Sequence, residues 1–353
     1  MSKKLILVLG ATGAQGLAVI DALLSPSGDG SPSLYAVRAL TRDPNGHRAK
    51  SLQAKGVELV QGNTDDLASV EAALQGVYGA WINIDGFTVG EVKESYAGLR
   101  IFELAKQAGI RHYVWSNLDY GLKKGGYNQI YRCEHYDGKG RIAEWMKQQS
   151  SVVSDTDMSW SVVTTGPYMD MLSFIMFAPL GQRKDGAYVF AAPIGNGHVP
   201  MIALSDLGFW ARWTFDHRAE TSAKDLEIAS DMVDWPYLVS AFTKATGHKA
   251  VFKSETLDEW FAHMRNTDRP VANQGIGSTT WKKNFSGWWS MFRDDICKRD
   301  MEWIMSINPH TRTVEKWMTE VNYDATVNRS LLKKGEEWSL DGIKRDMGSA
   351  SSL

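Results

Sequence analysis

The segment Leu5-Ile-Leu-Val-Leu-Gly10-Ala-Thr-Gly13-Ala-Gln-Gly16 decides the fold, because five apolar residues run directly into three glycines spaced three residues apart. A continuous apolar run of this kind fits a strand buried on both faces of a parallel sheet. Residues 17–24 then place apolar side chains at helical spacing. A strand, a glycine turn and a helix in this order are typical of folds that bind a dinucleotide.

Each of the three glycines has its own expected role. Gly10 permits the tight turn, Gly13 lets the backbone approach a pyrophosphate, and Gly16 lets the helix pack close to the strand. The helix N-terminus then offers unpaired N–H groups and a partial positive charge to the phosphates. The spacing is G-x-x-G-x-x-G rather than the G-x-G-x-x-G of many dehydrogenases. A glycine turn without a ligand is the alternative interpretation.

A second signal follows the next expected strand, residues 34–40, where the chain reads Thr41-Arg42-Asp43-Pro44. In dinucleotide folds this position contacts the adenosine ribose, and an acidic residue selects a free 2′-hydroxyl whereas an arginine accommodates a 2′-phosphate. Arg42 therefore predicts NADP(H) rather than NAD. Asp43 could instead bind the free 2′-hydroxyl, which would favour NAD. Arg38 lies inside the strand and is expected to be an edge or ladder residue.

Composition indicates a globular protein of the ordinary kind. The chain has 353 residues, of which 43% are hydrophobic and 23% charged, and a net charge of −2. A net charge this close to zero gives no sign of the basic patch or domain that direct nucleic-acid binding usually requires. The two cysteines make no disulfide framework, which favours an intracellular, cytoplasmic protein. We also expect no signal peptide, no membrane span and no metal site, and the oligomeric state stays open.

Strands alternate with helices as far as Thr165, and this rhythm predicts an α/β fold with a Rossmann-type, doubly wound parallel sheet. Ligands of such sheets bind outside the carboxyl ends of the strands. Asn63 and Thr64 follow the third expected strand and are cofactor candidates; Thr64 or Asp65 is expected to cap the next helix. The rim of the sheet should bring together Gly10 to Gly16, Arg42, Asn63, Asn83, Ser116 and Thr165.

The rhythm breaks after Thr165, which predicts a smaller α+β carboxyl-terminal lobe. We assign residues 1–165, with returns from about 198–235, to the NADP-binding domain. Residues 166–197 and 236–345 form the substrate-side lobe in this division, and residues 346–353 a disordered tail. Several of the 14 tryptophans lie late in the chain, within an aromatic-rich stretch expected to be helical over 279–317.

Taken together, these segments resemble the NmrA-like family of atypical short-chain dehydrogenase/reductases over residues 3 to about 320. The resemblance implies a Rossmann domain that binds NADP and a smaller lobe that closes over the nicotinamide end. The segments concerned are 10–16, 57–66, 115–117, 135–144, 165–170, 199–208 and 308–317. Carried over by position, the cofactor residues are Gly10, Thr12, Gly13, Gln15, Gly16, Arg42, Asn83 and Lys139. A Glu/Asn pair common in the family is here Asp170 and Met171.

The resemblance also frames the catalytic question. The wider superfamily uses Tyr-x-x-x-Lys with a serine after the fifth strand; here Lys139 is present, His135 stands in the tyrosine position and Ser116 at or beside the serine. With an ordinary pKa near neutrality, His135 would act as general acid/base beside NADP. A histidine packed at a helix start is the alternative. Tyr168, Met169 and Met171 are expected on the substrate side, with core packing as the alternative for each.

Smaller expectations concern aspartates and aromatic residues. Asp85 and Asp119 are expected to be solvated loop carboxylates, and Asp206 to be a helix N-cap or a family motif residue. The set Met171, Met176, Trp281, Trp288 and Trp289 is expected to be mostly core, with some members walling an aromatic pocket.

Two functions follow from the sequence. The first is an NADP(H)-binding enzyme of secondary metabolism that reduces a carbonyl or imine of an apolar, aromatic metabolite, or isomerises it by acid/base chemistry. The second is implied by the family resemblance: an inactive NADP-binding redox sensor, a transcriptional co-regulator that acts through a protein partner, for which a nuclear location is also expected.

Overall fold

The computed structural model describes residues 3–174, 176–274 and 277–326. The predicted tail at 346–353 and the last part of the predicted substrate-side lobe lie outside these residues. None of the described helices combines the length and apolarity needed to cross a membrane.

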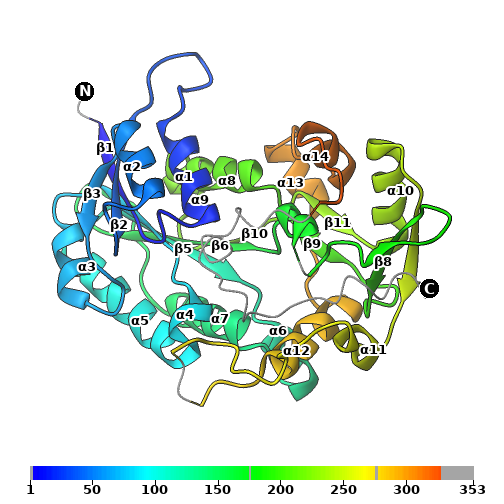
Figure 1. Ribbon diagram of the computed structural model, residues 1–353. Coiled ribbons are helices and arrows are strands. Elements are labelled where there is room, and N and C mark those ends of the chain that lie inside the picture. Colours follow the sequence, from blue (N-terminus) through cyan, green and yellow to red (C-terminus); the bar gives the residue numbers. More distant parts are fainter. Residues whose placement is uncertain (1–2, 175, 275–276, 327–353) are drawn as a thin grey trace.

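A seven-stranded parallel sheet forms one half of the molecule and confirms the predicted fold class (Figure 1). Its order is β10-β6-β5-β4-β1-β2-β3. Because β1 pairs with β2 on one side and β4 on the other, the order reverses beside β1, and a ligand crevice is expected there. The strands are β1 (Lys4–Val8), β2 (Tyr35–Thr41), β3 (Glu58–Gln61), β4 (Gly79–Ile82), β5 (His112–Leu118), β6 (Ser159–Thr165) and β10 (Asp225–Glu227).

Helices cover both faces of this sheet (Figure 1). On one face α1 packs against α8, where a Cβ at Gly208 would lie 2.6 Å from the Ala18 carbonyl oxygen. On the other face α5 packs against α3 and α7. The helices of this half are α1 (Ala14–Leu24), α2 (His47–Ala54), α3 (Leu67–Leu74), α4 (Gly86–Val89), α5 (Glu91–Gln107), α6 (Gly121–Lys124), α7 (Glu134–Met146), α8 (Leu204–Asp216) and α9 (Arg218–Thr221).

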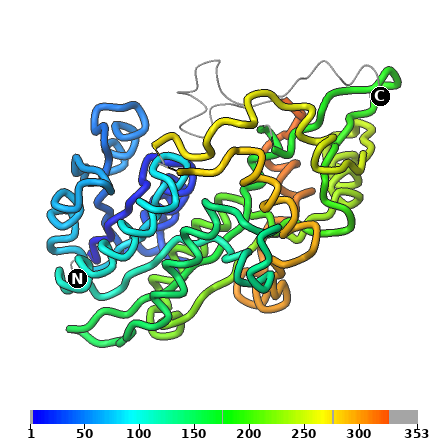
Figure 2. The backbone as a smooth tube through the Cα atoms, turned by 90° about the horizontal axis from the view of Figure 1, so that it is seen from below, coloured from blue at the N-terminus to red at the C-terminus, as the bar shows by residue number. Residues whose placement is uncertain are grey.

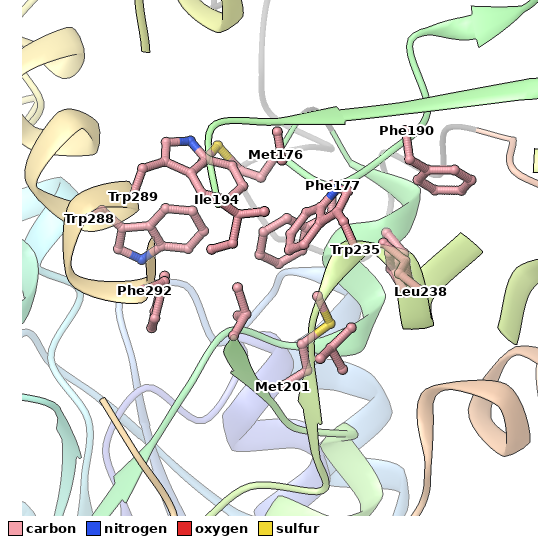
Figure 3. Packing of buried hydrophobic residues seen from close by; sticks show 14 of the residues in the cluster. Met176, Phe177, Phe190, Ile194, Met201, Trp235, Leu238, Trp288, Trp289 and Phe292 are labelled. Atoms are coloured by element: carbon pink, nitrogen blue, oxygen red, sulfur yellow. The ribbon is translucent and has the colours of Figure 1, made fainter. Parts of the chain in front are cut away.

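The second lobe combines two small sheets with helices around an aromatic core. Figure 3 shows that core, in which Trp235, Trp288 and Trp289 pack with Phe177 and Phe292. The Phe177 and Trp288 rings stack with centroids 5.6 Å apart. The elements are β7 (Gly181–Gln182), β8 (Tyr188–Ala192), β9 (Val199–Met201), β11 (Asp231–Val233), β12 (Ala250–Ser254), α10 (Trp235–Thr246), α11 (Leu257–Ala262), α12 (Trp281–Arg293) and α14 (Val314–Glu320), and α13 (Met301–Ile307) lies between the last two in the chain.

One late helix, α13, does not pack on the second lobe. It packs on the half of the molecule that contains the seven-stranded sheet, which we call the cofactor-binding half. Ile304 of α13 is buried in the same cluster as Ile6 and Val8 of β1. The neighbouring Trp303 ring lies 5.3 Å from that of Trp210 on α8. The predicted division assigned this stretch to the substrate-side lobe, whereas its packing joins it to the core beneath α8.

The structure settles three local details of the helices, and the cap of α3 differs from the one predicted. Asp66, not Asp65 or Thr64, caps α3 by accepting from the Ser69 N–H. Helix α7 begins at Glu134, and the missing side chains of Gly138 and Gly140 give it close contact with Glu94 and Tyr120. The stretch 279–317, which was expected to be helical, contains α12, α13 and the first part of α14.

The structure contradicts two predictions about aspartates, the N-cap role that was one alternative for Asp206 and the solvated position of Asp119. Asp206 lies inside the first turn of α8 and does not cap it; its carboxylate accepts from Ser230 Oγ at 2.6 Å and the Arg312 guanidinium at 2.7 Å. Asp119 is not solvated but fully buried, and it pairs with Arg299 Nη2 at 2.7 Å and Lys124 Nζ at 2.7 Å. Both side chains tie the late part of the chain to the cofactor-binding half.

Candidate cofactor and substrate site

A cavity of about 450 Å³ runs from the glycine turn after β1 into the second lobe. One end is lined by the carboxyl ends of β1, β2 and β3, and the other by aromatic and apolar side chains of the second lobe. Of the predicted site residues, it brings together Gly10, Thr12, Gly13, Gln15, Arg42, Asn63, Thr64, Asn83, His135, Lys139, Tyr168 and Met171.

The glycine turn provides an open helix end at this cavity. Gly13 is the N-cap of α1 and makes no side-chain cap hydrogen bond, so the N–H groups of the first turn can meet an anion. Gly10 has φ of 74°, and a Cβ there would lie 2.9 Å from the Asn83 carbonyl oxygen. Gly16 does not line the cavity: its missing Cβ would lie 2.2 Å from the Gly10 carbonyl oxygen, so it serves the packing of α1.

Directly after β2, Arg42 lines the cavity and is exposed. Asp43, which offered the opposite cofactor preference, does not line it; its carboxylate accepts from the Asn45 N–H at 2.9 Å and closes a local turn. Arg38 pairs with Glu58 at 2.9 Å and donates to the carbonyl of Ala73, as expected of a ladder residue. Arg42 therefore stays the predicted contact of an adenosine phosphate.

Lys139 lines the cavity and is held there by two hydrogen bonds and one ion pair. Its Nζ lies 3.1 Å from Asn83 Oδ1, 2.8 Å from the Ile84 carbonyl oxygen and 2.9 Å from Glu94 Oε1. Glu94 is fully buried, and Gly86 leaves room for it, because a Cβ there would lie 2.5 Å from Glu94 Oε2. Burial raises the pKa of the Glu94 carboxyl, and Lys139 opposes that shift.

His135 lines the cavity between two aromatic rings. Its ring centroid lies 4.4 Å from that of Phe87 and 5.4 Å from that of Phe285. Burial lowers the pKa of the His135 imidazole to about 3. The titration near neutrality that the sequence suggested is therefore wrong for the folded protein, and the imidazole is neutral at physiological pH.

Ser116 does not reach the cavity. It is buried beneath the glycine turn and donates to Gln15 Oε1 at 2.7 Å. Thr165 is likewise buried away from the cavity. Because Gln15 itself lines the cavity, Ser116 supports a cofactor-side residue instead of facing a substrate.

Apolar and aromatic side chains enclose the far end of the cavity. Met169 is not among them, since it is fully buried in the second-lobe core. Trp288 and Trp289 also belong to that core (Figure 3). The lining residues here are Phe87, Tyr168, Met171, Phe174, Met176, Val271, Trp281 and Phe285.

A chain segment of the second lobe, residues 269–274, crosses to the cofactor-binding half at this end of the cavity. The Asn273 N–H donates to the Phe87 carbonyl oxygen at 2.9 Å, and the Gln274 N–H to that of Thr88 at 3.1 Å. Figure 2 shows this stretch, in yellow, running over to the cyan segment that contains α4. Arg269, Val271, Asn273 and Gln274 line the cavity from this side.

Comparison with known proteins gives this fold and site a context. The model of the NmrA-like family matches residues 2–309. The chain belongs to the NmrA-like family. An NmrA-like family domain-containing oxidoreductase of Malbranchea aurantiaca is 24% identical over 263 residues, which cover 70% of this chain and 74% of that protein.

Two solved structures share the fold of this NmrA-like protein. NmrA, a negative transcriptional regulator in complex with NAD, superposes with a TM-score of 0.69 at 18% identity, over 91% of this chain and 96% of that one. An NADPH-dependent quinone oxidoreductase of Escherichia coli, complexed with NADPH, gives a TM-score of 0.65 at 18% identity, over 90% and 99%. At these identities the likeness shows the fold alone.

The loop after β6 departs from the family pattern at Asp170 and Met171. Met171 lines the cavity, whereas Asp170 does not, and burial raises the pKa of the Asp170 carboxyl to about 6. The NmrA-like protein therefore presents a thioether at this point of the cavity.

Sequence reasoning missed three functional candidates. Arg48 is buried and donates to the Thr12 carbonyl oxygen at 3.1 Å, bracing the glycine turn. Glu94 and Asn284 are both fully buried beside Lys139 and His135 respectively. For Arg48 the sequence did offer a signal, because this second arginine lies only six residues beyond Arg42, after the second strand. Among the residues described here, no cluster of His, Cys, Asp and Glu is arranged to hold a metal ion.

Proposed function

We propose that this NmrA-like protein is an NADP(H)-dependent reductase that acts on the carbonyl or imine group of an apolar, aromatic small molecule. The observation behind the proposal is the continuity of one cavity. It joins an uncapped helix N-terminus and Arg42 to Lys139 and His135, and then to an aromatic wall.

The residues present fit NADPH along that path. The first turn of α1 would bind the pyrophosphate, and Arg42 the 2′-phosphate. Lys139 and Asn83 would lie at the nicotinamide ribose, with Lys139 oriented by Glu94. The bound cofactor would supply the hydride. Stacking surfaces on Phe87, Trp281 and Phe285 favour a flat substrate and exclude water from the reacting group.

The names of related proteins support reduction rather than another chemistry. The relative from Malbranchea aurantiaca is named an oxidoreductase, and the bacterial structural neighbour is a quinone oxidoreductase that uses NADPH. A neutral His135 beside Lys139 is suited to hydrogen-bond the oxygen or nitrogen at which negative charge develops.

The test begins with calorimetric titration of NADPH and NADH into the purified protein. NADPH oxidation is then followed with quinones, aromatic ketones and cyclic imines, and products are identified by mass spectrometry. We expect tight NADPH binding, with turnover that falls at least about tenfold in Lys139→Met. Failure to bind either coenzyme would contradict the proposal.

A redox-sensing regulator is the second candidate, because one neighbour of the same fold is a negative transcriptional regulator that binds NAD. It predicts coenzyme binding without chemistry on any substrate of the panel. An isomerase would be recognised by product formation with NADP⁺ present and no change in coenzyme redox state.

A further inference from the structure

We propose that Asn284 is a positioning residue that fixes His135 in the tautomer with its proton on Nε2. The imidazole then presents a hydrogen-bond donor to the cavity. We infer that the substrate places a carbonyl oxygen or an imine nitrogen against this N–H. The identity of this acceptor rests on the proposed function.

The orientation of the Asn284 amide is set by the backbone. Its Oδ1 accepts the N–H of Glu134 at 2.8 Å. Glu134 is the first residue of α7, so this N–H has no partner within the helix. A backbone N–H can only donate, and a flipped amide would oppose it with another donor. Asn284 is fully buried, where such an opposition is costly.

With its oxygen committed to Glu134, the amide directs Nδ2 at the histidine. Asn284 Nδ2 lies 3.0 Å from His135 Nδ1. An amide nitrogen is a donor only, so Nδ1 must accept and carries no proton. Cys133 Sγ lies 3.4 Å from the same Nδ1, and its thiol stays protonated because burial raises the pKa of Cys133 well above its ordinary value. Two donors therefore converge on one ring nitrogen.

The other ring nitrogen faces the cavity. In the described part of the chain no hydrogen bond is made by Nε2, and Nε2 is not among the enclosed polar atoms that lack a partner. Phe87 and Phe285 hold the ring from its sides. A neutral imidazole with one proton must carry it on Nε2 when Nδ1 accepts.

This arrangement defines what His135 offers to a ligand. It is a neutral electrophilic donor, and substrates with an acceptor atom beside a flat apolar body match it. A ligand that offers only donor groups at this point, such as a protonated amine, would leave the Nε2–H unpaired, which favours carbonyl and imine groups over ammonium groups.

The test is the tautomer itself, measured on the full-length protein labelled with ¹⁵N-histidine, without coenzyme or substrate. Long-range ¹H–¹⁵N correlation spectra distinguish a protonated from an unprotonated ring nitrogen, and His135→Gln identifies the His135 signals. We expect an unprotonated Nδ1 and a protonated Nε2 from pH 6 to 8. A protonated Nδ1 in the wild-type protein would overturn the proposal.

Asn284→Asp provides the second arm. A carboxylate keeps the acceptor for Glu134 and turns the group facing Nδ1 into an acceptor, so the Nδ1 signal should move to the protonated position. Asn308→Asp, another buried asparagine, is the matched control and should leave the His135 signals unchanged. An unchanged Nδ1 signal in folded Asn284→Asp would also overturn the proposal. Because no coenzyme is used, this outcome is separate from failure of the proposed reductase function.

Discussion

The ammonium of Lys139 and the carboxylate of Glu94 meet inside the protein, with 2.9 Å between Nζ and Oε1 and no exposed surface on the Glu94 side chain. Removing one partner of a buried pair leaves the other charge uncompensated. We expect Glu94→Gln to lower the free energy of unfolding by about 3 kcal/mol, measured by urea denaturation. Binding of NADPH should weaken as well, because Lys139 loses its orientation.

A matched control lies on the same helix. Glu103 pairs with Arg100 at the surface of α5, where both side chains are more than 40% exposed. Glu103→Gln should change stability by less than about 1 kcal/mol. Equal costs for the two variants would contradict the special role of the buried pair.

Arg42→Ala should reduce the preference for NADPH over NADH. A charged hydrogen-bonding contact is worth about 1.5–3 kcal/mol, so the ratio of the two dissociation constants should shift by about ten- to a hundredfold. Calorimetric titration of both coenzymes measures it. Lys55→Ala, which removes an exposed lysine paired with Asp21, should leave the ratio unchanged. If Arg42→Ala leaves it unchanged too, the 2′-phosphate is bound elsewhere.

Stability should fall as the solution becomes acidic because two buried histidines are neutral in the folded protein. Burial lowers the pKa of both His112 and His135 from about 6.5 to about 3. The unfolded chain therefore binds protons first, and stability decreases from about pH 6.5 toward pH 3. By pH 5 each histidine should cost about 2 kcal/mol.

The comparison is made within each variant. For wild type, His112→Gln and His135→Gln, the free energy of unfolding is measured at pH 8 and pH 5, and the difference cancels any packing cost of the substitution. The difference between the free energies of unfolding at pH 8 and pH 5 should be about 2 kcal/mol smaller in each variant than in wild type. Identical differences in all three proteins would contradict neutral burial of these rings.

Arg299→Gln should destabilise the contact between the two halves. Burial disfavours ionisation of Asp119, but Arg299 and Lys124 outweigh it and lower the pKa of this carboxyl to about 2. Loss of Arg299 removes a fully buried partner and should cost about 3 kcal/mol. Arg293→Gln breaks a partly exposed pair with Asp294 and should cost less than about 1 kcal/mol. If Arg299→Gln costs as little as Arg293→Gln, Lys124 alone suffices to stabilise the buried carboxylate of Asp119.

The cofactor end of the site could be predicted because its signals are local in sequence. The glycine turn, Arg42 and Asn83 each follow directly after a strand, and parallel strands bring their carboxyl ends to one edge. The fold class and the family are confirmed on this basis. The individual roles of these residues stay predictions, to be tested by the variants above.

The other end depends on contacts between distant segments, which no local pattern reveals. Glu94 reads as a surface residue of an amphipathic helix until α4 and α7 close over it. Asn284 gives no signal at all, since its partners lie 149 and 150 positions away. Asp119 and Met169 were misplaced for the same reason, because the chain that buries them follows much later.

The position of α13 has a practical consequence for dividing this protein. Because Ile304 and Trp303 complete the hydrophobic interior beneath α8, the nucleotide-binding half draws part of its interior from a stretch that follows the substrate-side segments. We expect that a fragment ending near residue 235 would expose Trp210 and aggregate. Chimeras with relatives should therefore exchange residues 300–308 together with the amino-terminal half, using two junctions instead of one.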